Sequence, residues 1–215
     1  MRLLPALARS CLAVTLAAPA AEAETLEPTP GYFIGCDAEA IPAICYFNAA
    51  GLNWAVSQVN APADLFDLLT SLPMLEPVTI AGDYAELADS SADLALTGLS
   101  LPEEEDINIG NLRAMQGEWQ PNGEEAPFSI LIVGMDWLEM VNGEMEGAFM
   151  IAVGPACADG VEPGGMAISL YRYGDDPAAD ACWQLEYIDD TTMNLRDVMG
   201  AQGQVAFTRL PPSEG

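Results

Sequence analysis

Residues 136–151 read DWLEMVNGEMEGAFMI and predict a β-hairpin. The central pair Asn142-Gly143 is typical of a two-residue type I′ turn, in which both positions need a positive φ. Such a turn pairs Val141 with Glu144 and sets the register of the two strands that it joins. We therefore expect an antiparallel pair of strands on either side of it.

The two faces of this hairpin differ in polarity, because successive side chains of a strand point to opposite sides. This register places the apolar residues on one face, which is expected to point inward: Leu138, Met140, Met145, Phe149 and Ile151. The face expected to meet solvent carries Trp137, Glu139, Glu144 and Glu146. In this register Glu139 lies opposite Glu146, and a like-charge pair of this kind must be solvated or bridged by a cation.

The hairpin belongs to a longer series of short β-type runs separated by turn residues. No helical period appears between the runs, so parallel strands joined by helices are not expected. Antiparallel strands closing into a small up-and-down barrel fit this pattern best. The eight expected strands cover residues 117–120, 128–133, 136–141, 144–153, 166–173, 181–188, 193–197 and 205–210.

The preceding part of the chain shows a different pattern. Residues 24–31 are expected to form a spacer, and apolar residues spaced by three and four predict a helix over 41–58. Asn60 can cap a second short helix that Pro73 ends, a hairpin is expected to follow over 78–101, and residues 102–106 form an acidic linker.

The expected fold class is therefore mainly β with a helical N-terminal part, an α+β arrangement. Two helices and a hairpin would precede the small antiparallel barrel. Three segments are predicted: a signal peptide over 1–23, the helical and hairpin region with its acidic linker over 24–106, and the barrel over 107–215.

Two residues at the ends of the barrel segment carry a family resemblance. Gly117-Glu118-Trp119 lies on its first strand and Arg209 on its last. This combination resembles the lipocalin and calycin barrels. The resemblance implies that Trp119 lies at the closed end and that Arg209 packs across it as a cation–π pair. Both roles are structural.

The N-terminus and the cysteines predict export. Two arginines, an apolar stretch over 11–20 and a small-x-small motif at 21–23 are typical of a signal peptide, which places the protein in the periplasm or outside the cell. No later stretch is apolar enough to span a membrane. The even set Cys36, Cys45, Cys157 and Cys182 argues for two disulfides. Of three possible pairings we favour Cys36–Cys45 and Cys157–Cys182, each within one half of the chain.

The charge excludes several function classes. The formal net charge is −27, with no histidine and no lysine. So acidic a chain repels nucleic acid and anionic lipid. Without histidine a Ser-His-Asp or Cys-His arrangement cannot form, and no motif predicts a metal or a cofactor. We expect a protein that is not an enzyme.

Three functions stay open, and the partner and oligomeric state are left undetermined. The first is binding of a small apolar molecule in or on the barrel, with a pocket lined by Phe149, Ile151, Leu170 and Trp183. The second is a protein-interaction or inhibitor-type module with a filled barrel. The third is a carboxylate-based hydrolase, which needs two acids facing one cleft about 5–10 Å apart.

Overall fold

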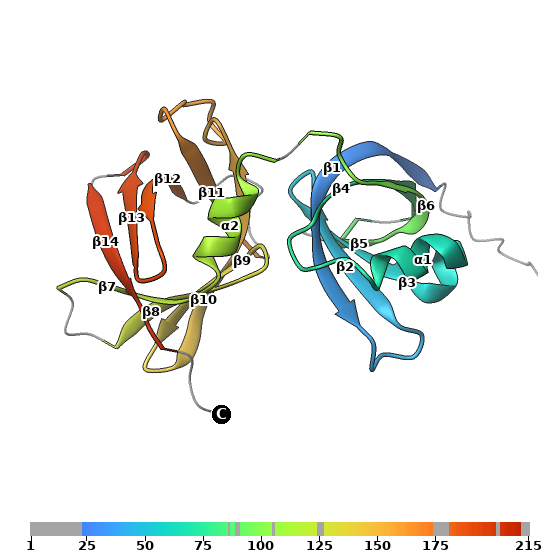
Figure 1. Ribbon diagram of the computed structural model, residues 1–215, viewed down its shortest axis with the longest axis horizontal. Coiled ribbons are helices and arrows are strands. Elements are labelled where there is room, and N and C mark those ends of the chain that lie inside the picture. The colour runs from blue at the N-terminus through green and yellow to red at the C-terminus, as the bar shows by residue number, and fades with distance from the viewer. Residues whose placement is uncertain are drawn as a thin grey trace, which may run out of the picture.

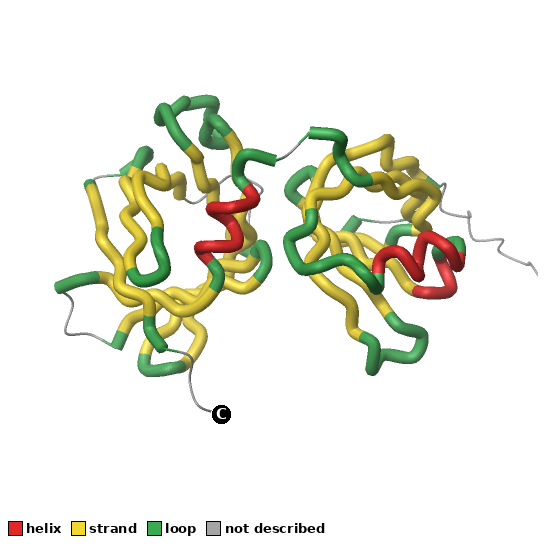
Figure 2. Tube along the Cα trace, in the orientation of Figure 1, coloured by secondary structure: helices red, strands yellow, loops and turns green. Residues whose placement is uncertain are grey.

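The computed structural model describes residues 23–85, 87–88, 91–104, 106–123, 127–173, 181–200 and 203–211. The predicted signal peptide therefore lies almost wholly outside the described residues. Figure 1 shows two β units side by side, one from blue to green and the other from yellow to red. Strands dominate both units in Figure 2, where the short helical segments are red. No helix among the described residues is long and apolar enough to cross a membrane.

The N-terminal unit is a six-stranded sheet in the order β5-β3-β2-β1-β4-β6. Its strands are β1 Glu24–Asp37, β2 Ile44–Ala49, β3 Leu52–Ser57, β4 Pro77–Tyr84, β5 Ser91–Asp93 and β6 Ala95–Ser100. Only Leu94 separates β5 from β6, yet the two strands form opposite edges, so the sheet curls round on itself. Phe66 and Leu69 of helix α1 (Ala63–Leu69) complete the apolar core of this unit.

The prediction of a helical N-terminal part was wrong. Residues 41–58, expected as a helix, contain strands β2 and β3, followed by a 3₁₀ turn over Gln58–Asn60. A two-residue turn joins these strands, because Ala50 and Gly51 have φ values of 53° and 73°. Strand alternation on either side of a tight turn mimics the spacing of a helix over so short a stretch.

The other N-terminal expectations also need correction. Residues 24–31 are the first half of β1 and not a spacer. A helix does follow Asn60, but Pro62 occupies its N-cap position and no side chain caps it. The hairpin expected over 78–101 is not a simple one. Its strands β4 and β6 do pair antiparallel, but β5 lies between them in the chain.

The C-terminal unit is a closed, up-and-down antiparallel barrel of eight strands, as predicted. Each strand pairs with the next along the chain, and the last pairs with the first. Helix α2 (Ile109–Met115), which the sequence pattern did not predict, precedes the barrel. The strands are β7 Gly117–Pro121, β8 Phe128–Val133, β9 Asp136–Val141, β10 Glu144–Gly154, β11 Met166–Arg172, β12 Ala181–Ile188, β13 Thr192–Asp197 and β14 Gln204–Arg209.

The β9–β10 hairpin has the predicted turn but not the predicted register. Asn142 and Gly143 have φ values of 56° and 80°, and Val141 pairs with Glu144. A bulge then falls between Met145 and Gly147, which shifts every later pair by one residue. The expected pairing of Glu139 with Glu146 was therefore wrong.

The bulge reverses the expected faces of strand β9. Trp137 is buried in the barrel core, while Met145 is 60% exposed. Glu139 lies on the same side of β9 as Trp137 and pairs with Gly147. A carboxylate expected on the outer surface therefore lies at the barrel interior.

Both predicted disulfides are present. Cys36 and Cys45 are register partners on β1 and β2, and Cys157 before β11 is bonded to Cys182 on β12. On the chain-entropy estimate each closed loop stabilises the fold by about 3 kcal/mol.

Several contacts join the two units. Leu75, in the loop before β4, is fully buried and belongs to the core cluster of the barrel. The Tyr32 hydroxyl donates a hydrogen bond of 2.5 Å to Asp106. Burial and then this bond raise the pKa of Tyr32 above its usual value, so the phenol remains a donor. Asn53 donates to the hydroxyl of Tyr173, which in turn donates to Asp136 on β9.

Candidate functional site

One end of the barrel is closed around Trp119 and Arg209. The Arg209 guanidinium lies 4.1 Å from the centroid of the Trp119 ring. Its Nε donates to the carbonyl of Asp190 at 2.7 Å, and its two terminal nitrogens donate to the carbonyls of Ala114 and Gln116. These carbonyls lie at the end of α2, where a cation is favourable because the carbonyls have no helical partner.

The same end leaves no room for additional side-chain atoms. Trp119 donates its Nε1 to the carbonyl of Met115 at 2.8 Å and is fully buried. A Cβ atom added to Gly117 would lie 2.8 Å from a terminal nitrogen of Arg209, and Gly117 has a φ of 115°. The glycine of the Gly-x-Trp motif is thus required both by backbone conformation and by the position of Arg209.

The opposite end of the barrel opens into a cavity of about 340 Å³. This volume lies near the lower limit for small-molecule sites, roughly 300–1,000 Å³. Its walls are mainly aromatic and aliphatic, with two charged residues among them. They comprise Pro121, Phe128, Ile130, Trp137, Glu139, Phe149, Leu170, Arg172, Ala181, Trp183, Val205 and Phe207.

The structure brings together three of the four residues expected to line a pocket. Phe149, Leu170 and Trp183 line the cavity. Ile151 is not among its lining residues and lies fully buried in the core cluster, so its expected place in the pocket was wrong. The barrel is thus packed near Trp119 and hollow at the opposite end.

Glu139 and Arg172 supply the charge of the cavity. The guanidinium of Arg172 lies 4.4 Å from the centroid of the Phe149 ring. Burial raises the pKa of the Glu139 carboxyl above its usual value of 4.5, and the nearby Arg172 charge offsets part of that rise. A Cβ atom on Gly147 would come within 2.9 Å of a Glu139 carboxylate oxygen, so the glycine opposite makes room for the carboxylate.

The indole of Trp137 contains a buried polar atom without a hydrogen-bond partner. Its side chain is 3% exposed, and its Nε1 has no hydrogen-bond partner among the described residues. By contrast, the indole nitrogens of Trp54 and Trp119 both donate to backbone carbonyls. A buried donor without an acceptor costs about 1–3 kcal/mol.

Sequence reasoning missed Trp137, Glu139 and Arg172 as site residues. The first two were assigned to the outer surface because the hairpin register was extended without a bulge. Arg172 occupies an inward position of β11, two residues after Leu170, which also lines the cavity. That alternation was the only signal in the sequence that could have predicted Arg172 in the cavity.

A different cavity, of about 420 Å³, lies between the two units. Its lining includes Ile34, Tyr46, Asn53, Trp54 and Asp136. Asn53 and Asp136 are already hydrogen-bonded to Tyr173, as described above. Two of its polar side chains are therefore committed to the contact between the units.

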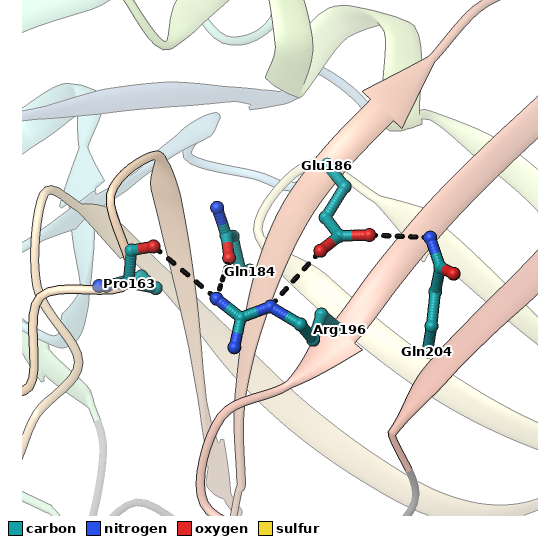
Figure 3. A network of polar contacts seen from close by, with 5 residues as sticks. All are labelled: Pro163, Gln184, Glu186, Arg196 and Gln204. Atoms are coloured by element: carbon teal, nitrogen blue, oxygen red, sulfur yellow. Dashed lines mark hydrogen bonds and ion pairs between the residues drawn. The ribbon is translucent and has the colours of Figure 1, made fainter.

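The outer wall of the barrel carries a network of polar contacts. Figure 3 shows Arg196 on β13 donating to Glu186 at 3.1 Å, to Gln184 and to the carbonyl of Pro163 at 3.4 Å. Gln204 on β14 donates to the second oxygen of Glu186 at 2.6 Å. The network links three neighbouring strands across the barrel surface.

Within the part of the chain that the structure describes, no group of three acidic or cysteine side chains lies close enough together to hold a metal ion. Among the residues that line the barrel mouth, Glu139 is the single acid. No family model, curated protein or solved structure matches this chain.

Proposed function

We propose that this protein binds a small, largely apolar molecule in the mouth of its C-terminal barrel and is not an enzyme. The observation that carries the proposal is the 340 Å³ cavity, whose wall includes the aromatic rings of Trp137, Phe149 and Trp183. Aromatic and aliphatic walls with a few polar groups are typical of small-molecule sites. Burying a ligand against them removes apolar surface from water.

We also propose that the barrel is lipocalin-like. The eight-stranded antiparallel closure, the Gly117-x-Trp119 motif and the position of Arg209 over Trp119 support this relationship. The two disulfides fit an oxidising compartment, which supports export to the periplasm or the exterior. Fractionation of cells, with detection of the protein outside the cytoplasm, tests this part of the proposal.

Titration with the neutral fluorescent probe N-phenylnaphthylamine tests the binding site. The probe becomes bright in an apolar environment, and saturable binding at one site per chain is expected. A Val205→Phe substitution fills the mouth and should weaken binding at least tenfold. The matched control is Val133→Phe, because Val133 lies on β8, is 47% exposed and does not line the cavity.

Two results would contradict the proposal. One is the absence of saturable binding by wild-type protein, together with native mass spectra that show only the bare chain after purification from its source. The other is equal loss of affinity in both valine variants, which would place the probe elsewhere. Both variants should keep the far-ultraviolet spectrum of the wild type, so that loss of fold is recognised.

A further inference from the structure

We propose that the ligand of the barrel mouth is an uncharged molecule with an apolar body and a hydroxyl group that donates a hydrogen bond to the carboxylate of Glu139. This inference rests on the function proposed above and specifies the chemistry of the ligand. It concerns one polar contact, so it can fail while the cavity still binds apolar molecules.

The first argument is the position of the Glu139 carboxylate. Strand β7 begins at the closed end, and β9 runs in the same direction because both pair antiparallel with β8, so β9 ends at the open end. Glu139 lines the cavity from this part of β9. A Cβ atom added to Gly147 would lie 2.9 Å from its carboxylate and 3.1 Å from a ring carbon of Phe149, which lines the same cavity. The carboxylate therefore lies beside the apolar wall.

The second argument is that this carboxylate has room for a donor. Burial is the main cause that raises the pKa of Glu139, and no hydrogen bond from a described residue opposes the rise. Its oxygens are not among the polar atoms that the described part of the fold buries without a partner, so they stay open to a ligand. An ionised carboxylate can only accept hydrogen bonds, and its partner must therefore be a donor.

The third argument concerns the charge of the ligand. The cavity wall holds one acid, Glu139, and one base, Arg172, whose guanidinium lies 4.4 Å from the centroid of the Phe149 ring. A carboxylate ligand would meet the repulsion of Glu139, and an ammonium ligand that of Arg172. Burying either ion also carries a large desolvation cost unless it is fully paired. A hydroxyl group donates a hydrogen bond without either penalty.

Four naphthalenes of similar shape provide the test: hydroxymethylnaphthalene, ethylnaphthalene, naphthoate and naphthylmethylammonium. The ratio of alcohol affinity to hydrocarbon affinity should be about tenfold higher in wild-type protein than in Glu139→Leu, the value of a hydrogen bond to a charged group. Comparing the ratio between two proteins cancels the difference in hydrophobicity of the two compounds. Glu144→Leu is the matched control and should keep the wild-type ratio, because Glu144 is exposed and does not line the cavity.

A spectroscopic measurement on wild-type protein avoids dependence on the variants. Titration of the side-chain carboxyl carbon of Glu139 by nuclear magnetic resonance follows its pKa directly. The bound alcohol should lower this pKa, because its hydroxyl stabilises the carboxylate, whereas bound ethylnaphthalene should raise it by displacing water. Arg172 on β11 is the other charged residue of the cavity wall, and the lining residues from β7, β8, β10, β12 and β14 are uncharged.

The outcomes separate the two proposals. An equal affinity ratio in wild type and Glu139→Leu, or a Glu139 pKa that the alcohol raises as the hydrocarbon does, would overturn the inference and leave apolar binding intact. Tightest binding of the naphthoate or of the ammonium compound would overturn the uncharged ligand. Failure of all four compounds to bind would count against the proposed function itself.

Discussion

Arg209 links three segments of the closed barrel end through a single side chain. It lies over Trp119, binds the carbonyls at the end of α2 and reaches the carbonyl of Asp190 in the β12–β13 turn. The planar guanidinium suits this arrangement, because its donors point in fixed directions within one plane. A lysine ammonium could not bond to all three carbonyls and also stack on the ring.

Replacing Arg209 with methionine should lower the free energy of unfolding by about 2–4 kcal/mol, because charged hydrogen bonds and a cation–π contact are lost together. Urea denaturation followed by circular dichroism measures this change. Arg113→Met is the control. Arg113 pairs with Glu76 at 3.0 Å but is half exposed, so its loss should cost less than about 1 kcal/mol. Equal costs for the two variants would contradict the role given to Arg209.

The Glu139 carboxyl should make stability depend on pH. Burial raises its pKa in the folded state, so the native protein retains this proton at pH values where the unfolded chain has lost it. Wild-type stability should therefore fall as pH rises from the usual value of 4.5 through the higher folded value. Glu139→Gln should remove this component of the pH profile.

The control for this experiment is Glu144→Gln, since Glu144 is exposed on strand β10. Its profile should follow that of the wild type over the same pH range. Thermal unfolding at a series of pH values compares the three proteins. Identical profiles for wild type and Glu139→Gln would show that the carboxyl is solvated and not enclosed by the mouth.

Two tight turns show how individual elements depend on backbone conformation. Ala50-Gly51 and Asn142-Gly143 both have positive φ at each position, which is the type I′ geometry. Asparagine tolerates this region of φ well, whereas alanine does not. The β2–β3 turn therefore contains a strained residue where the β9–β10 turn does not.

Exchanging these residues should have opposite effects. Ala50→Asn should raise the free energy of unfolding by about 0.5–1 kcal/mol, and Asn142→Ala should lower it by about 1 kcal/mol. Chemical denaturation of both variants measures the changes. Equal signs would show that side-chain contacts, and not φ, govern these turns.

The same two turns explain which elements could be predicted from sequence. Asn-Gly is a strong turn signal, and the eight barrel strands were found because such signals separate them. Ala-Gly is a weak signal, so Ile44–Ala49 and Leu52–Ser57 were merged into a helix. Helix α2 was missed because seven residues are too few to show a reliable period.

The candidate site was predictable only where strand alternation is unbroken. Phe149, Leu170 and Trp183 were placed in the pocket correctly. Trp137 and Glu139 were placed on the wrong face because a bulge adds one residue to β10. Nothing local in the sequence marks this bulge, since the packing of the whole barrel decides which residue is left unpaired.

Leu75 couples the two units of the molecule. It is fully buried in the barrel cluster although its chain neighbours belong to the N-terminal unit, and its φ of 62° is unusual for a branched residue. The Leu75 N–H donates to the Phe33 carbonyl and the Phe33 N–H donates to the Glu76 carbonyl, and these bonds hold the loop in place. Such strain persists only where surrounding contacts compensate for it.

Leu75→Ala should lower stability by about 2–5 kcal/mol and weaken the coupling of the units. In calorimetry the wild type should unfold in one transition and the variant in two. Leu69→Ala is the control, because Leu69 is equally buried but packs only within the N-terminal cluster. A single transition in Leu75→Ala, with the same loss as in Leu69→Ala, would contradict the coupling.

The arginines have one more consequence, which concerns digestion. Beyond residue 22 the chain has no lysine, and its four arginines all lie in α2 or in barrel strands. Trypsin cuts after these residue types and needs an unfolded segment to do so, so its rate here reports opening of α2 or of the barrel strands. The N-terminal sheet offers this protease no cleavage site of its own, and a ligand in the mouth should slow cutting at Arg172 before it affects Arg113.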